Sequence, residues 1–71
     1  MKARTGDLIY VPSEVLLYTT DETAPNTIKE WKKTKKPEHL LITSIHDAAY
    51  EVLYENNYWL VKKNKVYYTR S

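Results

Sequence analysis

One stretch decides the fold class: Tyr50-Glu-Val-Leu-Tyr-Glu-Asn-Asn-Tyr-Trp-Leu-Val-Lys-Lys-Asn-Lys-Val-Tyr-Tyr68. Apolar and polar side chains alternate along residues 50–55 and again along 58–62, which is typical of half-buried β-strands. Asn56 and Asn57 lie between the two runs, and asparagine tolerates the positive φ angles that a tight hairpin turn requires. We therefore predict a β-hairpin, followed by a polar turn at 62–65 and a last short strand at 66–70.

Pairing across a turn at Asn56 and Asn57 predicts which side chains face the core. Tyr54 then lies opposite Trp59, and the side chains on the core face are Tyr50, Val52, Tyr54, Trp59 and Val61. The other face is a mixture of charged and apolar groups, namely Glu51, Leu53, Glu55, Tyr58, Leu60 and Lys62. A shift of one residue would expose the aromatic set, so the pattern specifies the faces strongly.

The remaining chain predicts three more strands and one different segment. Residues 7–11, 15–20 and 39–45 are rich in β-branched and aromatic side chains, which favours strands. Residues 21–38 are polar, and Thr27 to Glu30 matches a helical capping box. Ile28 and Trp31 lie three apart, so we predict a short helix over 28–34 with Trp31 turned inward; an irregular loop is the alternative.

These elements predict an all-β domain over residues 1–71: a small barrel of about five strands with a short helix or ordered loop near residues 27–36. Gly6-Asp-Leu-Ile-Tyr-Val11 and the later order of strands, tight turn and polar turn resemble SH3-like barrels. The chain also resembles short single-domain SH3-like proteins of tailed bacteriophages. This resemblance implies an accessory or virion-associated protein that docks on a phage assembly or a host protein, in the host cytoplasm or the virion.

Composition limits the functions to be considered. The 71 residues carry a net charge of +2 and no cysteine. No apolar run approaches the roughly 20 residues of a membrane span, and the charged N-terminus lacks the apolar run of a signal peptide. We therefore expect neither membrane insertion nor secretion by a signal peptide.

The sequence offers little to catalysis. His39 and His46 lack a metal-binding spacing, and the single glycine, Gly6, leaves no glycine-rich phosphate loop. Ser44, His46 and Asp47 are the residue types of a catalytic triad, but they are neighbours in sequence and no oxyanion-hole turn accompanies them. We therefore expect a protein that is not an enzyme and has no metal and no cofactor; a pocket around His39 or His46 is the distant alternative.

Two interaction hypotheses remain, and the first rests on tyrosine. A small barrel cannot bury seven tyrosines, and exposed tyrosine favours protein interfaces. We predict partner contacts at Tyr18, Tyr58, Tyr67 and Tyr68, with one of the last two pointing outward. Ordinary solvent-facing strand tyrosine is the alternative interpretation.

The second hypothesis rests on a basic cluster. Its members are Lys29, Trp31, Lys32, Lys33, Lys35 and Lys36, with Lys62 and Lys63 as a second basic group. Lysines beside an aromatic ring can neutralise phosphates while the ring stacks on a base, so the cluster predicts contact with nucleic acid or with an acidic partner. The alternative is a solvated loop with Trp31 as a lid on the core. A shared face for the two basic groups would strengthen the nucleic-acid hypothesis.

Overall fold

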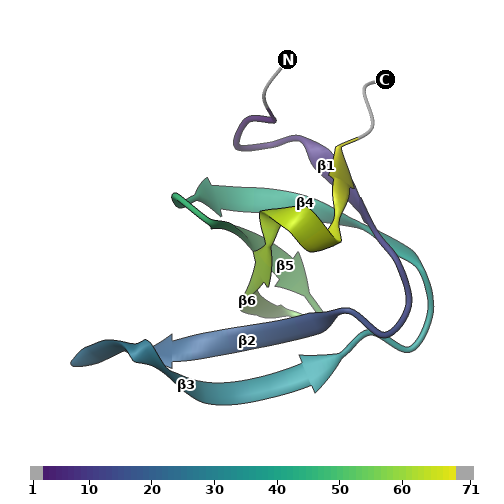
Figure 1. The fold of residues 1–71 in the computed structure, drawn as a ribbon. Helices are drawn as coiled ribbons and strands as arrows, with labels where there is room; N and C mark the ends of the chain where they lie inside the picture. Colours follow the sequence, from purple (N-terminus) through teal and green to yellow (C-terminus); the bar gives the residue numbers. More distant parts are fainter. Residues whose placement is uncertain (1–2, 69–71) are drawn as a thin grey trace.

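The computed structural model describes residues 3–68, and Figure 1 shows its strands. The elements are β1 (Leu8–Val11), β2 (Leu16–Asp21), β3 (Ala24–Lys33), β4 (Glu38–Ile45), β5 (Ala49–Tyr54), β6 (Asn57–Lys62), the 3-10 turn η1 (Lys63–Lys65) and β7 (Tyr67–Tyr68). All neighbouring strands are antiparallel, and they form one open sheet in the order β3-β2-β6-β5-β4-β1-β7. The prediction of an all-β chain is confirmed, but the described residues contain seven strands rather than about five.

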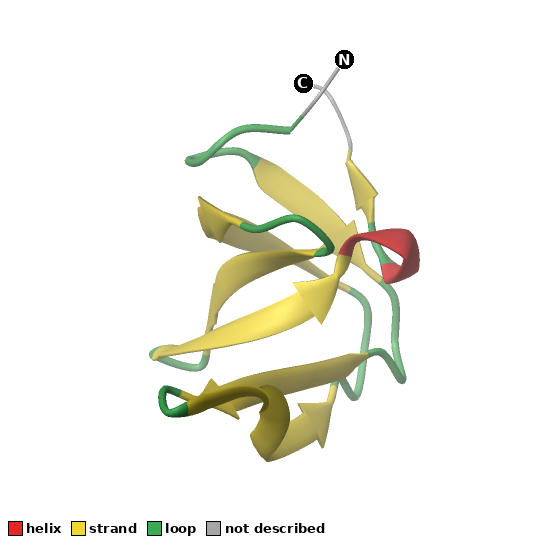
Figure 2. Cartoon of the chain, turned by 60° about the vertical axis from the view of Figure 1, so that its left-hand side comes forward, coloured by secondary structure: helices red, strands yellow, loops and turns green. Residues whose placement is uncertain are grey.

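The sheet curls around a single core. Figures 1 and 2 show the β2–β3 hairpin across from β1 and β4, with β5 and β6 between them. Alternate side chains point inward, as the pleat of a strand requires. The fully buried ones are Ile9, Val11, Leu17, Ile42, Val52 and Val61. Every strand from β1 to β6 except the edge strand β3 therefore contributes an apolar residue to this core.

The β5–β6 hairpin has the predicted faces with a different turn. Glu55 and Asn56, with φ of 50° and 66°, form the turn. Val52 therefore lies opposite Trp59 and Tyr54 opposite Asn57, a shift of two residues from the predicted pairing. A shift of two leaves every side chain on its own face. Accordingly Val52, Tyr54 and Val61 are buried, and Tyr50 and Trp59 pack against the core.

The predicted helix or ordered loop near residues 27–36 is wrong over residues 27–33, because Ala24–Lys33 forms strand β3, and residues 34–36 lie in the turn that follows it. Trp31 pairs with Tyr18 and Glu30 with Thr19, but the next pair is Ile28 with Thr20. Lys29 is thus skipped by a β-bulge, which puts Ile28 and Trp31 on the same face of the strand. The three-residue spacing that suggested a helical turn is produced here by the bulge.

Two smaller predictions are also corrected. Trp31 does not tuck inward, since its side chain is 64% exposed, and Ile28 is 50% exposed. Both lie on the outer face of β3, away from the core. The last strand is shorter than the predicted 66–70, because β7 spans Tyr67–Tyr68. Thr69 and Arg70 lie outside the described residues.

Thr34 anchors the base of the β2–β3 hairpin. It is 1% exposed and is the buried polar residue of the described chain. Its Oγ1 accepts a hydrogen bond from the Val15 amide (3.1 Å) and donates one to the Pro12 carbonyl (2.7 Å). Its own amide donates to the Val15 carbonyl, and its carbonyl accepts from the Glu14 amide. One side chain thus joins the end of β3 to the segment that leads into β2.

Candidate protein-interaction surface

A row of exposed apolar side chains crosses four adjacent strands on the outer face of the sheet. Leu8 on β1 pairs with Leu41 on β4. Leu41 pairs with Leu53 on β5, and Leu53 pairs with Tyr58 on β6. Directly paired side chains have Cβ atoms about 4.5–5.5 Å apart, so the four are in lateral contact range. We call Leu8, Leu41, Leu53 and Tyr58 the apolar row.

The apolar row is exposed to solvent. Its side chains are 50%, 39%, 39% and 61% exposed, in the order Leu8, Leu41, Leu53 and Tyr58. No charged residue stands between them in the register. Exposed apolar groups that are contiguous, rather than scattered singly, mark interaction sites on soluble proteins. The row therefore makes the outer face of β1, β4, β5 and β6 the strongest candidate surface.

An aromatic corner continues this surface toward the β7 edge. The Tyr10 ring lies 5.5 Å from the His39 ring and 6.2 Å from the Tyr67 ring, measured between centroids. Tyr67 is 63% exposed, while Tyr68 points to the other face and packs against the core. The more exposed tyrosine of this pair is thus Tyr67, whereas Tyr68 is partly buried.

At the opposite side the outer face continues through β2 to β3. Leu60 pairs with Tyr18, and Tyr18 pairs with Trp31. Tyr18 is half-buried between these neighbours, whereas Trp31 is mostly exposed. Tyr18 therefore contributes less exposed area to this surface than Trp31 does.

The predicted basic cluster is divided by the sheet. Lys33 pairs with Leu16 on the outer face, and Lys62 lines a pocket of about 230 Å³ together with Leu16 and Lys65. One lysine from each predicted group therefore lies beside Leu16. Lys29, Lys35 and Lys36 are exposed, in β3 and in the turn that follows it. Lys63 instead lies over the Tyr50 ring, 5.3 Å from its centroid.

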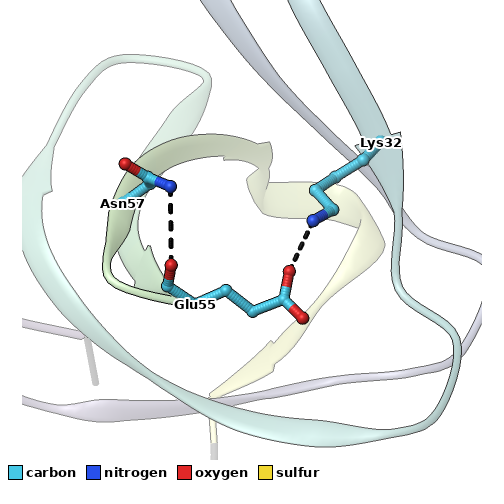
Figure 3. A network of polar contacts seen from close by, with 3 residues as sticks. All are labelled: Lys32, Glu55 and Asn57. Atoms are coloured by element: carbon cyan, nitrogen blue, oxygen red, sulfur yellow. Dashed lines mark hydrogen bonds and ion pairs between the residues drawn. The ribbon is translucent and has the colours of Figure 1, made fainter.

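Lys32 lies on the core-facing side of β3 and belongs to a partly exposed network of polar and aromatic contacts. Figure 3 shows its ammonium paired with the Glu55 carboxylate, while the Glu55 carbonyl accepts a hydrogen bond from Asn57 Nδ2 (3.4 Å). The ammonium also lies 5.3 Å from the Tyr54 ring centroid and 5.6 Å from that of Trp59, within the range of cation–π attraction. The hydrogen bond with Glu55 raises the pKa of Lys32. Lys32 is thus engaged by its own chain, unlike Lys33.

The same network predicts a loss of stability at high pH. Burial, followed by the nearby Glu55 and Glu38 carboxylates, raises the pKa of Tyr54 above its ordinary 10.0. A raised folded-state pKa stabilises the protein below the unfolded-state value, and this stabilisation is lost as pH rises through the folded-state value. We expect the free energy of unfolding, measured by urea titration, to fall above about pH 10.

Two comparisons test that alkaline effect. Tyr54→Phe should make the decline in stability above about pH 10 shallower, because it removes the titrating hydroxyl. Of the two groups with a raised pKa, only Lys32 then remains to contribute to the decline. The absorbance of ionised tyrosine should show a group that titrates above the ordinary tyrosine pKa of 10.0, and that group should be missing from Tyr54→Phe. A stability that is constant between pH 9 and pH 11 would contradict the assignment.

Neither a metal centre nor a membrane-spanning helix is found within residues 3–68. In this range no three His, Asp or Glu side chains are grouped so that they could hold a metal ion. No helix there has the length and apolar character needed to cross a bilayer. His46 is exposed in the β4–β5 turn, and its amide donates to the Ala49 carbonyl (2.9 Å).

The sequence identified one end of the apolar row and missed the rest. Tyr58 was predicted as a contact, whereas Leu8, Leu41 and Leu53 were not. In the predicted hairpin, Leu53 and Tyr58 lay on the face that carries charged residues. Two apolar side chains on that outward face were the sequence feature that indicated the row. Comparison with known proteins found no matching family model, no matching curated protein and no matching solved structure.

Proposed function

We propose that this chain is a small SH3-like barrel that acts as a non-enzymatic protein-interaction module. The order of elements supports the barrel: a first strand, a long hairpin excursion, a three-stranded meander, a 3-10 turn and a last short strand that returns to the first. β1 pairs with both β4 and β7, so it joins the meander to the end of the chain. Such barrels serve many purposes, so the function rests on the surface rather than on the fold.

The apolar row carries the functional proposal. Four exposed apolar side chains in direct register give a folded partner a continuous, uncharged strip to cover. Leucine and tyrosine lose little conformational freedom on binding compared with lysine or glutamate, so burying them is favourable. The occupant that fits is the apolar surface of a folded protein, since the four side chains of the row carry no charge and the group that borders Tyr58 is the acidic Glu51, which does not attract a phosphate or a carboxylate.

The resemblance to small phage proteins narrows the proposed partner. On that basis the chain is an accessory or virion-associated protein, and its partner is a component of a phage assembly or a host protein. Tyr67, beside Tyr10 and His39, extends the contact surface at the β7 edge. Its exposed ring is suited to the rim of such an interface.

Substitution within the row tests the proposal. The tagged chain is purified from its source and the proteins that remain bound are compared between wild type and Leu53→Glu. We expect Leu53→Glu to lose the partner, with affinity at least about thirtyfold weaker, because a buried charge replaces an anchor worth about 2 kcal/mol.

A matched control is available on the same face of the sheet. Leu16 is 36% exposed, close to the 39% of Leu53, and lies on β2 outside the row. Leu16→Glu should keep the partner, and circular dichroism should show both variants folded. Equal retention by wild type and Leu53→Glu, or equal loss from both variants, would refute the apolar row as the docking surface.

Contact with single-stranded nucleic acid is the second candidate. The observation that favours it is the position of Lys33 and Lys62 beside Leu16, with the exposed Trp31 ring nearby on β3. A base that stacks on Trp31 would quench the tryptophan fluorescence. Because the lysines would hold the phosphates, added salt should weaken this quenching. A flat titration with single-stranded DNA and RNA at low salt would remove this candidate.

A further inference from the structure

β3 forms a long, unpaired edge of the sheet. It has ten residues, and in the part of the chain that the structure describes it pairs with β2 alone. The opposite edge, β7, has two residues. An edge strand presents backbone amides and carbonyls that can pair with another extended segment. β3 pairs with β2 in regular register from Glu30 to Lys33 and with register shifts from Glu30 to Ala24, so the regular part around Trp31 has the free side needed for an added strand.

The bulge gives this edge a line of exposed contacts. Ile28, Trp31 and Lys33 all lie on the outer face, because Lys29 is skipped in the register. Ile28 and Trp31 are 50% and 64% exposed. A strand added beside β3 would bring alternate side chains against this line, which is how strand addition obtains its sequence preference.

The charge along the edge selects among possible occupants. Exposed lysines outnumber acidic groups along β3 and the turn that follows it, where Lys29, Lys33, Lys35 and Lys36 stand against Glu30. At the other end of the hairpin Asp21 and Glu22 lie beside Lys29, so the positive charge is concentrated at the Lys33 end. A second copy of β3 centred antiparallel on Trp31 would place Lys29 opposite Lys33, which is destabilising, and Glu30 opposite Lys32, which is stabilising. Self-pairing therefore gains no net attraction between charges, while an acidic strand is electrostatically matched.

We propose that the β3 edge binds an extended acidic segment of another protein by strand addition. An apolar side chain of that segment packs on Trp31 and Ile28, and a carboxylate two residues away lies near Lys33. Lysines on an edge also prevent unwanted pairing. That role alone would not account for an exposed tryptophan and isoleucine on the same strand, since exposed apolar groups promote pairing.

A designed probe tests this site. A short peptide that repeats Val-Thr-Glu-Thr, and so presents valine and glutamate two residues apart on one face, is titrated into the ¹⁵N-labelled protein, with a peptide that repeats Val-Thr-Lys-Thr as the charge control. We expect the amide signals of β3 to shift with the acidic peptide and to remain unchanged with the basic one. Trp31→Ala and Lys33→Glu should each weaken binding at least about tenfold.

Two further comparisons separate strand addition from contacts of side chains alone. The acidic peptide is N-methylated at alternate backbone nitrogens in two versions. One version should lose binding and the other keep it, because only one edge of an added strand faces β3. Tyr67→Ala is the matched variant, since Tyr67 is 63% exposed at the far edge and should not affect binding.

Several results would overturn the proposal. They are unchanged β3 signals, equal binding of the basic peptide, equal tolerance of both methylated peptides, and tighter binding of single-stranded DNA at Trp31. The site is separate from the apolar row, so Leu53→Glu should bind the acidic peptide as wild type does. If the acidic peptide does not bind β3, the proposed docking through the apolar row is unaffected. If the apolar row does not bind a partner, the proposed site on β3 is likewise unaffected.

Discussion

Ile42→Ala is expected to lower the free energy of unfolding by about 2–5 kcal/mol. Ile42 is fully buried at the centre of β4, opposite Val52 on β5. Its backbone also pairs with the segment that enters β1: the Gly6 amide donates to its carbonyl (2.8 Å), and its amide donates to the Asp7 carbonyl (2.9 Å). A domain of this length has a total stability of about 4–11 kcal/mol, so the loss is a large share.

The neighbouring leucine supplies the control for this prediction. Leu41 is one residue away on the same strand but is 39% exposed and belongs to the apolar row. Leu41→Ala should change the free energy of unfolding by less than about 1 kcal/mol, while it should weaken the binding of the partner. Urea titration measures both variants. Equal destabilisation by the two substitutions would show that the inner and outer faces are assigned incorrectly.

Thr34→Val is expected to cost about 2–4 kcal/mol of stability. The substitution keeps the shape of the side chain but removes the hydroxyl that accepts from the Val15 amide and donates to the Pro12 carbonyl. Both backbone groups then lose a protein partner, and Val15 is buried. Because these bonds tie the β2–β3 hairpin to the core, hydrogen exchange in β2 and β3 should also accelerate.

In contrast to Thr34→Val, Thr19→Val should not lower the free energy of unfolding. Thr19 Oγ1 is buried, and among the described residues it has no hydrogen-bond partner. Thr19→Val therefore removes an unsatisfied polar group and is expected to be neutral or to stabilise the protein by up to about 1 kcal/mol. Thermal and urea unfolding of the two variants can be compared directly. Destabilisation of equal size at both positions would contradict the hydrogen-bonding role of Thr34.

The hairpin shows how far a sequence pattern can determine a fold. Alternation between Tyr50 and Val61 predicted correctly which side chains face the core, because face is set by odd and even position alone within each strand. The turn was displaced because a shift of two residues satisfies the same alternation. The predicted and observed registers differ in which two residues form the turn. The observed turn requires a positive φ at Glu55 and Asn56, and glutamate in that conformation is uncommon.

β3 shows why local signals failed over residues 24–33. A capping box and a three-residue apolar spacing are correct indicators of a helical turn. Pairing with β2 overrode them, and the bulge at Lys29 gave Ile28 and Trp31 a common face without a helix. A bulge depends on the partner strand, so the sequence of one strand alone does not reveal it.

The apolar row could not be derived from the sequence for a related reason. Its members come from four strands, and they become neighbours only through the order β6-β5-β4-β1. The pairing of Leu8 with Leu41 joins distant parts of the chain. Within the hairpin alone, Leu53 and Tyr58 looked like isolated apolar groups on a mixed face. Strand order, rather than residue type, turned them into a surface.

Hydroxyl-radical footprinting of the chain alone and in its isolated complex tests the docking surface most directly. Side chains that a partner covers lose reactivity, and each oxidised residue is located by mass spectrometry. We predict strong protection of Leu8, Leu41, Leu53 and Tyr58, while Leu16 keeps its reactivity. Unchanged reactivity along the whole row in the complex would contradict docking through this surface.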